Sequence, residues 1–330
     1  MKRSARTAAA LGAMAALALT VAGCAPAEEA AQEEISIAFV MGAESDPFFQ
    51  AMKVGAEAAA KANNIDLIWQ GDPSEYSPAT QIPVVDQVLA QKPDALVLIP
   101  TDPTALQASV AKAKAAGIPV INVDTRVNDL TDVLSFITGD NADGGAKAAD
   151  ALAKAIKYKK GKTYQVVVGL TSATATTNVA RLDGFSKQIA KKYPGIKIVD
   201  KAYSQSQPAK ANTNVSNWLT KYPKLAGIFA IDGTNAAGAA AAIQAKGLKG
   251  KVALVGYDAY KANVDLIGKG VFTALVAQDP AAEAKLAIEY LVKYFAGQTS
   301  GIKKEVVIPN VVLSKSSSKA DLAKYTYVQK

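Results

Sequence analysis

The chain has 330 residues, half of them hydrophobic, and a formal net charge of +8 at neutral pH. This length and composition provide for two domains with buried cores and argue against a globally disordered protein. Histidine is absent, which excludes Ser-His-Asp and Cys-His catalysis and His-ligated zinc or copper sites. We therefore expect no metal and no cofactor.

The first 24 residues have the form of an export signal. Three basic residues precede an apolar stretch over residues 8–21, and the only cysteine, Cys24, follows two small residues. The pattern resembles the bacterial lipobox, which implies that residues 1–23 are a lipoprotein signal peptide and that Cys24 carries the lipid. An uncleaved signal anchor is the alternative, although the stretch is short and rich in alanine for a bilayer span.

The segment after Cys24 has no apolar periodicity. Residues 24–34 are rich in Ala and Glu and are predicted to be a flexible tether between lipid and domain. Beyond them the lysines are scattered with acids between them, and the chain without its signal peptide has a net charge of about +5. Because no basic cluster with interleaved aromatics occurs, we expect no nucleic-acid partner.

From residue 35 the chain alternates β-branched runs with longer Ala-rich segments of helical period. The first series predicts strands over residues 35–41, 65–70, 95–99, 118–123 and 134–138, and helices over residues 47–62, 82–91 and 103–116. Pro47 and Pro103 stand at predicted helix starts, where proline is favoured, and Gly117 stands at a helix end.

The same alternation then occurs a second time. A helix over residues 143–157 connects to strands over 164–169, 196–202, 225–231, 252–257 and 272–277 and to helices over 178–192, 209–221, 235–246 and 261–269. A helix over 280–295 and a strand over 306–313 follow. The sequence therefore predicts an α/β protein with two doubly wound, Rossmann-like parallel sheets.

Polar and aromatic residues follow the predicted strands in both halves. In doubly wound sheets the ligand binds outside the carboxyl ends of the strands, where loops and helix N-termini converge. The residues at these ends are Asp46, Phe48, Phe49, Asp124, Arg181, Asp232, Asp258 and Gln278. Each aspartate alone could be a helix N-cap and each phenylalanine a core residue, but their recurrence in both halves favours a shared site.

The residue types at this site suit a neutral ligand with many hydroxyl groups. Aspartates accept hydroxyl hydrogens, arginine and glutamine donate to oxygens, and aromatic rings cover C–H patches. Four aspartates against one arginine also leave open a ligand with some positive charge, such as an amino sugar.

Several motifs together resemble the extracytoplasmic sugar-binding proteins of ABC importers that group with ribose-binding protein. The motifs are Asp46-Pro47-Phe48-Phe49, Ile99-Pro100-Thr101-Asp102, residues 118–124, Gly139-Asp140-Asn141, Gly144-Gly145, residues 181–185, Val255-Gly256-Tyr257-Asp258 and Ala277-Gln278-Asp279-Pro280. Thr125 stands where ribose binders often have arginine, and Asp232 where asparagine is common, so the resemblance leaves the sugar open.

This resemblance implies a type I periplasmic binding protein fold with no enzymatic activity. The N-terminal lobe would comprise residues 35–139 plus 279–311 and the C-terminal lobe residues 140–278 plus 312–330, with three hinge crossings between them. The family's ligand site falls on the eight residues above, with Tyr203 as a second aromatic. It also implies a permease and its ATPase subunits as partners, a monomer, and a place outside the cell membrane, in the periplasm or on the cell surface.

Other functions remain open at this stage. A glycosidase could use two of the aspartates as acid and base. A regulator of the lactose-repressor type shares the two-lobed fold but needs a helix-turn-helix where this chain has its signal segment. A sensor that passes a ligand signal to a membrane receptor has the same sequence features as an importer subunit. A binding protein for a non-sugar ligand, such as an amino sugar or an autoinducer-like molecule, is a further alternative. The sequence also leaves open whether Arg126, Tyr203 or Tyr260 reaches the pocket.

Overall fold

The computed structural model describes residues 34–328, in which strands and helices alternate as predicted. The strands are β1 (Ile35–Ala43), β2 (Ile65–Asp72), β3 (Ala95–Leu98), β4 (Val120–Val123), β5 (Val133–Gly139), β6 (Tyr164–Leu170), β7 (Ile196–Tyr203), β8 (Leu225–Ala230), β9 (Ala253–Tyr257), β10 (Ala274–Ala277), β11 (Glu305–Ile308) and β12 (Val311–Ser314). The helices are α1 (Pro47–Ala62), α2 (Pro78–Ala90), α3 (Gln107–Ala115), α4 (Asn141–Ala155), α5 (Thr176–Lys192), α6 (Pro208–Lys221), α7 (Gly233–Ala245), α8 (Lys261–Gly268), α9 (Pro280–Phe295) and α10 (Lys319–Tyr325), with a 3-10 turn, η1 (Thr299–Gly301).

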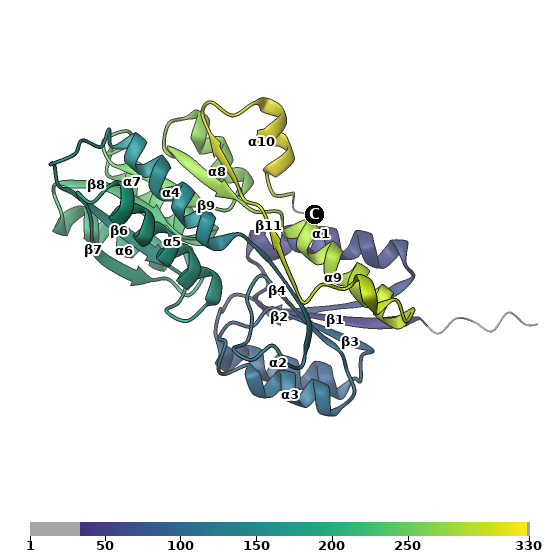
Figure 1. Cartoon of the computed structure of the whole chain (residues 1–330). Helices are drawn as coiled ribbons and strands as arrows, with labels where there is room; N and C mark the ends of the chain where they lie inside the picture. The colour runs from purple at the N-terminus through teal and green to yellow at the C-terminus, as the bar shows by residue number, and fades with distance from the viewer. Residues whose placement is uncertain (1–33, 329–330) are drawn as a thin grey trace, which may run out of the picture. The chain divides into compact units, whose positions relative to one another are not determined.

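The strands form two six-stranded sheets, each the centre of one lobe. The first sheet has the order β11-β5-β4-β3-β1-β2, and the second has the order β12-β10-β9-β8-β6-β7. Helices α1 and α9 pack together on one face of the first sheet and α2 with α3 on the other, while α4 with α5 and α6 with α7 cover the second sheet (Figure 1). The predicted two-lobed α/β fold is confirmed.

Side chains of β1 point alternately to the two faces of the first sheet. Ile37, Phe39 and Met41 are fully buried toward α1 and α9, while Ala38 and Val40 are fully buried toward α2 and α3. A strand buried on both faces explains why the predicted strands are continuous apolar runs, as parallel sheets require. None of the helices that the model describes is both long and apolar enough to span a membrane.

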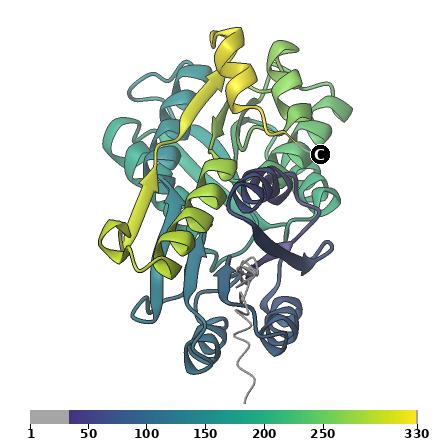
Figure 2. The same cartoon turned by 90° about the vertical axis from the view of Figure 1, so that its right-hand side faces the viewer.

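The chain passes from one sheet to the other three times. It leaves β5 for α4, returns from β10 to α9, and crosses again between β11 and β12 (Figure 2, yellow strands). The single strand predicted over residues 306–313 is therefore wrong: its two halves belong to different sheets, because the chain crosses at Pro309 and Asn310. β12 also pairs antiparallel with β10, the exception among otherwise parallel pairs in the described sheets.

Some predicted helix limits also change. Helix α2 begins at Pro78, four residues before the prediction, because the Ser77 hydroxyl caps it, accepting a hydrogen bond from the Ala79 amide. Helix α3 begins at Gln107, later than predicted, because residues 102–106 form turns. Helix α10 was not predicted. The proposed signal peptide, the lipid attachment at Cys24 and all but the last residue of the tether lie outside the described residues.

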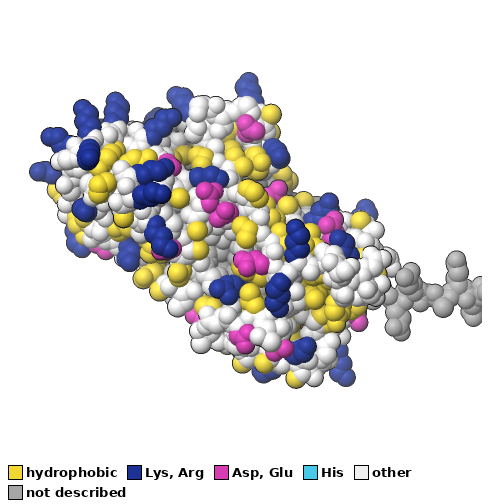
Figure 3. Space-filling view, in the orientation of Figure 1, with side chains coloured by type: hydrophobic (Ala, Val, Ile, Leu, Met, Phe, Trp, Pro, Cys, Tyr) yellow, Lys and Arg dark blue, Asp and Glu magenta, His cyan; other side chains and the backbone are white. Residues whose placement is uncertain are grey.

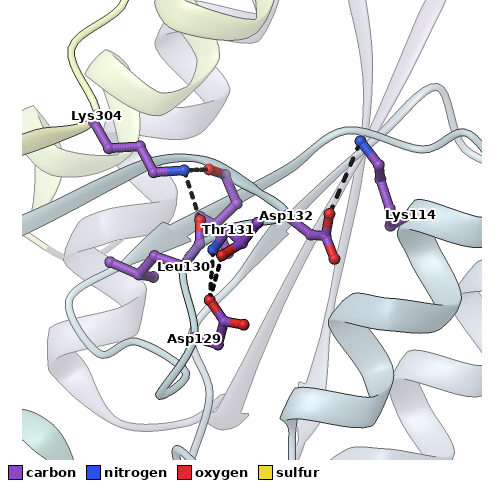
Figure 4. Close-up of polar contacts among 7 residues, drawn as sticks. Lys114, Asp129, Leu130, Thr131, Asp132 and Lys304 are labelled. Carbon is purple, nitrogen blue, oxygen red and sulfur yellow. Dashed lines mark hydrogen bonds and ion pairs between the residues drawn. The ribbon is translucent and has the colours of Figure 1, made fainter.

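The loop between β4 and β5 begins at the predicted site residue Asp124 and is held at its far end by polar contacts (Figure 4). The Asp129 carboxylate accepts hydrogen bonds from the Thr131 amide (2.9 Å) and hydroxyl (2.6 Å). Lys304 Nζ donates to the Leu130 carbonyl oxygen at 2.6 Å and to that of Val133. These contacts tie the loop to the segment that leads into β11.

Two glycines allow α4 and α5 to pack with their backbones in contact. A Cβ atom on Gly184 would lie 1.9 Å from the Ala142 carbonyl oxygen, and one on Gly145 would lie 2.0 Å from that of Arg181. Both contacts involve backbone atoms, which cannot rotate away. The motifs Gly144-Gly145 and residues 181–185 of the sequence thus set the distance between these two helices.

Gly184→Ala should therefore lower the free energy of unfolding by about 2 kcal/mol, because α5 must move away from α4. Gly268→Ala is the matched control: Gly268 ends a helix, nothing lies within 4 Å of its missing Cβ, and alanine should leave stability unchanged or raise it by about 0.5 kcal/mol. Urea unfolding measures both. Equal stability of the two variants would contradict the packing argument.

Candidate functional site

A cavity lies where the carboxyl ends of strands from both sheets meet. The empty space that its lining residues enclose, together with the solvent at its mouth, is about 390 Å³. All eight predicted residues line it, and so do six that were not assigned to the site: Tyr76, Thr171, Thr177, Asn178, Ser206 and Tyr260. The structure thus brings together the residues that were predicted from their position at the carboxyl ends of the strands.

Asp46 is the N-cap of α1 and faces the second lobe. Its Oδ1 accepts a hydrogen bond from the Phe48 amide at 2.9 Å and one from the Tyr260 hydroxyl, and its Oδ2 accepts one from the Thr234 hydroxyl at 3.0 Å. Burial raises the pKa of Asp46 to about 6, against the opposing effect of the Tyr260 hydrogen bond. One carboxylate of the first lobe therefore holds two hydroxyl donors of the second lobe.

The aromatic wall of the cavity comes from the start of α1. Phe48 and Phe49 are buried, and their rings meet edge to face with centroids 5.4 Å apart. Proline at the first helical position fixes the direction in which α1 leaves β1. The ring faces are therefore held in place before any ligand arrives.

Arg181 lies deep in the second lobe and is 3% exposed. Its Nε donates to Asn141 Oδ1 at 2.7 Å, and its Nη1 donates to the carbonyl oxygen of Ile231 at 3.0 Å. The guanidinium carbon lies 3.8 Å from the centre of the Tyr257 ring. Because guanidinium has five N–H groups, the side chain is fixed and still has donors for a ligand.

Two further aspartates are held by the second lobe. Asp258 accepts hydrogen bonds from the Gly233 amide (2.9 Å) and from Gln278 Nε2 (2.8 Å). Asp232 caps α7 by accepting from the Asn235 amide at 2.8 Å, and it also accepts from the Thr171 hydroxyl at 2.7 Å. Burial raises the pKa of Asp232, although these hydrogen bonds oppose the effect.

Asp124 is the site carboxylate with a free acceptor. It is 7% exposed, and its Oδ1 is buried without a hydrogen-bond partner. Burial raises the pKa of Asp124 to about 7, although the nearby Arg181 lowers it. The carboxyl group can thus accept a hydroxyl hydrogen when ionised and donate one when protonated, as a polyhydroxylated ligand requires.

The raised pKa makes stability depend on pH. A folded pKa of about 7 above an unfolded value of 3.8 contributes stability below pH 4 that is lost as pH rises through 7. From pH 5 to pH 8 the loss from Asp124 is on the order of 2 kcal/mol. We expect Asp124→Asn to remove that part of the pH dependence, as measured by urea unfolding of the ligand-free protein. An unchanged slope would contradict the assignment of the pKa.

Three residues that the sequence left open are now placed. Tyr260 lines the cavity, whereas Arg126 does not and lies on an outer groove between the lobes, where its backbone amide donates to the Thr176 hydroxyl at 3.2 Å. Tyr203 does not line the cavity and is 41% exposed, at the end of β7 near the edge of the second sheet. The expectation that Tyr203 is the second aromatic of the site is wrong, and the aromatic residue of the second lobe that lines the cavity is Tyr260. Its position two residues after Asp258 was the available signal.

Residues 34–328 contain no group of three or more Cys, His, Asp or Glu side chains arranged to hold a metal ion. The carboxylates of the cavity instead face hydroxyl, amide and guanidinium donors. The chemistry that this lining supports is hydrogen bonding to a small polar ligand.

Comparison with known proteins agrees with this geometry. Residues 37–299 match the family model described as a periplasmic binding protein domain. The D-ribose/D-allose-binding protein of Pseudomonas aeruginosa is 32% identical over 85% of this chain and 88% of its own length. The ribose import binding protein of Bacillus subtilis is 30% identical over 80% of this chain and 83% of its own. An ABC transporter solute-binding protein from Agrobacterium vitis, solved with α-D-tagatopyranose, superposes with a TM-score of 0.84 at 33% identity, covering 90% of this chain and all of that one.

Proposed function

The chain belongs to the periplasmic binding protein family, and from this premise we propose that it is a sugar-binding protein of an ABC importer. It would enclose one monosaccharide, a pentose, hexose or polyol, between its lobes and deliver it to the permease. The observation that carries the proposal is the cavity, in which carboxylate, guanidinium, amide and aromatic groups from both lobes converge.

Each predicted site residue has a role in this proposal. Asp124, Asp232 and Asp258 take hydroxyl hydrogens, while Arg181 and Gln278 donate to sugar oxygens. Phe48 and Phe49 cover the C–H face of the ring, and Asp46 joins the lobes around the ligand. Because burial raises the pKa values of Asp46, Asp124 and Asp232, the cavity carries less negative charge than four ionised aspartates would give it, which suits a neutral sugar.

Binding would proceed by closure of the lobes. We propose the lobe limits 35–139 plus 279–311 and 140–278 plus 312–330, except that Val311, the first residue of β12, goes with the second lobe. Hinge motion would occur at the three chain crossings. The open form exposes both half-sites, and contacts that exist only between closed lobes, such as those of Asp46, favour closure. The closed monomer then presents both lobes to the permease, whose ATPase subunits drive import.

We further propose that Cys24 carries a lipid that holds the domain on the outer face of the cell membrane. Figure 3 shows lysines and arginines dispersed among acidic and apolar side chains on the visible face, which does not favour a nucleic-acid partner. Mass spectrometry of the full-length protein purified from membranes tests this proposal. We expect cleavage before Cys24 and a diacylglycerol adduct on that cysteine. An unmodified cysteine would contradict it.

A thermal-shift screen of residues 34–330 tests the function. The panel contains pentoses, hexoses, polyols, amino sugars and amino acids, because a ligand that binds only the folded state stabilises it by about 2.7 kcal/mol at a hundredfold excess over its Kd. We expect a shift with sugars or polyols. A shift with amino acids alone would keep the fold and overturn the proposed ligand class.

A further inference from the structure

The last residues that the structure describes return to the site from outside. After α10 the backbone amide of Tyr327 donates to the Ala259 carbonyl oxygen at 2.9 Å, and Tyr327 forms a parallel bridge with Tyr260. This segment lies beyond residues 37–299, which match the family model. It packs beside the loop that carries Asp258.

Tyr327 reaches two parts of the site with one hydroxyl group. It is 5% exposed, and its hydroxyl donates to Asp258 Oδ1 at 3.0 Å and accepts from the backbone amide of Gln278 at 3.2 Å. The same Oδ1 accepts from the Gln278 side chain at 2.8 Å. The hydroxyl therefore links the loop after β9 to the crossing after β10.

The Tyr327 ring also touches the opposite lobe. Its centroid lies 6.1 Å from that of Phe48 in the first lobe and 6.0 Å from that of Tyr260 in the second. Phe48 lines the cavity, whereas Tyr327 contacts Phe48 without being part of the lining.

Asp258 has a conformation that needs such support. Its φ of +63° is in the left-handed region, which is uncommon for residues other than glycine. Its backbone amide donates to the Val276 carbonyl oxygen at 2.8 Å, and the Gly233 amide holds its Oδ2. Tyr327 adds a second donor to Oδ1, beside the Gln278 side chain, so that both oxygens of the carboxylate are hydrogen-bonded.

We propose that the C-terminal segment is part of the sugar site and that Tyr327 is a positioning residue, which orients the Asp258 carboxylate and the Gln278 crossing for the ligand. This inference rests on the proposed function.

The test is Tyr327→Phe, which keeps the ring and removes the hydroxyl. With D-allose as the probe in isothermal titration calorimetry, we expect the Kd to rise about tenfold. Tyr325→Phe is the matched control, since the structure gives the Tyr325 hydroxyl no hydrogen bond, and its Kd should stay within twofold of wild type. A Kd of Tyr327→Phe within twofold of wild type would overturn the inference.

A second variant separates positioning from a general loss of stability. In an Asp258→Asn background, Tyr327→Phe should raise the Kd by clearly less than tenfold, because only its contact with the Gln278 amide is left to lose. A full tenfold loss in both backgrounds would show that the hydroxyl acts elsewhere and would overturn the proposal.

A third measurement needs no ligand. Tyr327→Phe removes the acceptor of the Gln278 amide, so hydrogen exchange at this amide should accelerate, while Tyr325→Phe leaves it unchanged. If the wild-type protein binds no sugar, the proposed function fails, and this exchange decides the inference separately. Faster exchange at the Gln278 amide in Tyr327→Phe supports the link between Tyr327 and the crossing after β10, and an unchanged rate overturns it.

Discussion

Arg181→Ala should abolish sugar-induced stabilisation and raise the Kd at least a hundredfold. Hydrogen bonds to Asn141 and to the Ile231 carbonyl oxygen hold the Arg181 side chain in place. The side chain lines the cavity and has further N–H groups that can donate to a ligand. A buried, positioned arginine at the centre of a site is a typical binding hot spot. The variant should also lose about 3 kcal/mol of unfolding free energy, because nearby buried carboxylates lose their positive neighbour.

Calorimetric titration measures the affinity, and urea unfolding measures the stability. Arg126→Ala is the control, because Arg126 also lies between the lobes but does not line the cavity. Its affinity should remain near that of wild type. If both variants bind the sugar as tightly as wild type, the cavity is not the binding site.

Asp46→Ser should shift the ligand-free protein toward an open form. Serine keeps the N-cap of α1 but is too short to accept from both Tyr260 and Thr234. Hydrogen bonds to a charged acceptor contribute about 1.5–3 kcal/mol each, so losing two should change the closure equilibrium by at least about a hundredfold. Sugar affinity should fall as well, because part of the binding free energy is then used to close the lobes of the open form.

Small-angle X-ray scattering measures this shift as a larger radius of gyration without ligand. Asp86→Ala is the control, since Asp86 pairs with Lys112 on the surface of the first lobe. It should leave the radius unchanged. If the radius of gyration of Asp46→Ser equals that of wild type, the contacts of Asp46 with Tyr260 and Thr234 do not hold the lobes closed.

Much of the fold follows from local patterns. Helices α1 and α9 have the predicted limits because an aspartate cap followed by proline marks each start. The strand over residues 306–313 was mispredicted for a tertiary reason: its two halves are equally β-branched, and only the position of the sheets assigns each half to its partner. Helix α10 is seven residues long, too short for a helical period to be recognised.

The site was predictable where a general rule of parallel sheets applies. Asp124 and Asp258 follow strands directly and Asp232 comes two residues after the end of β8, so topology fixes their place at the carboxyl edge. Tyr260 and Tyr327 could not be assigned in this way. Their directions depend on the left-handed turn at Asp258 and on the return of the chain end, which long-range contacts determine. The prediction that Tyr203 lies in the site was wrong because Tyr203 ends β7, an edge strand, and its side chain is exposed to solvent.

We expect one sugar to bind between the two lobes. A crystal structure of residues 34–330 grown with the sugar that gives the largest thermal shift is the decisive experiment. One sugar should lie in the cavity, with its hydroxyl groups bonded to Asp124, Arg181 and Asp258 and its ring against Phe48. A sugar bound outside the cavity, or bound with no contact to these side chains, would contradict it.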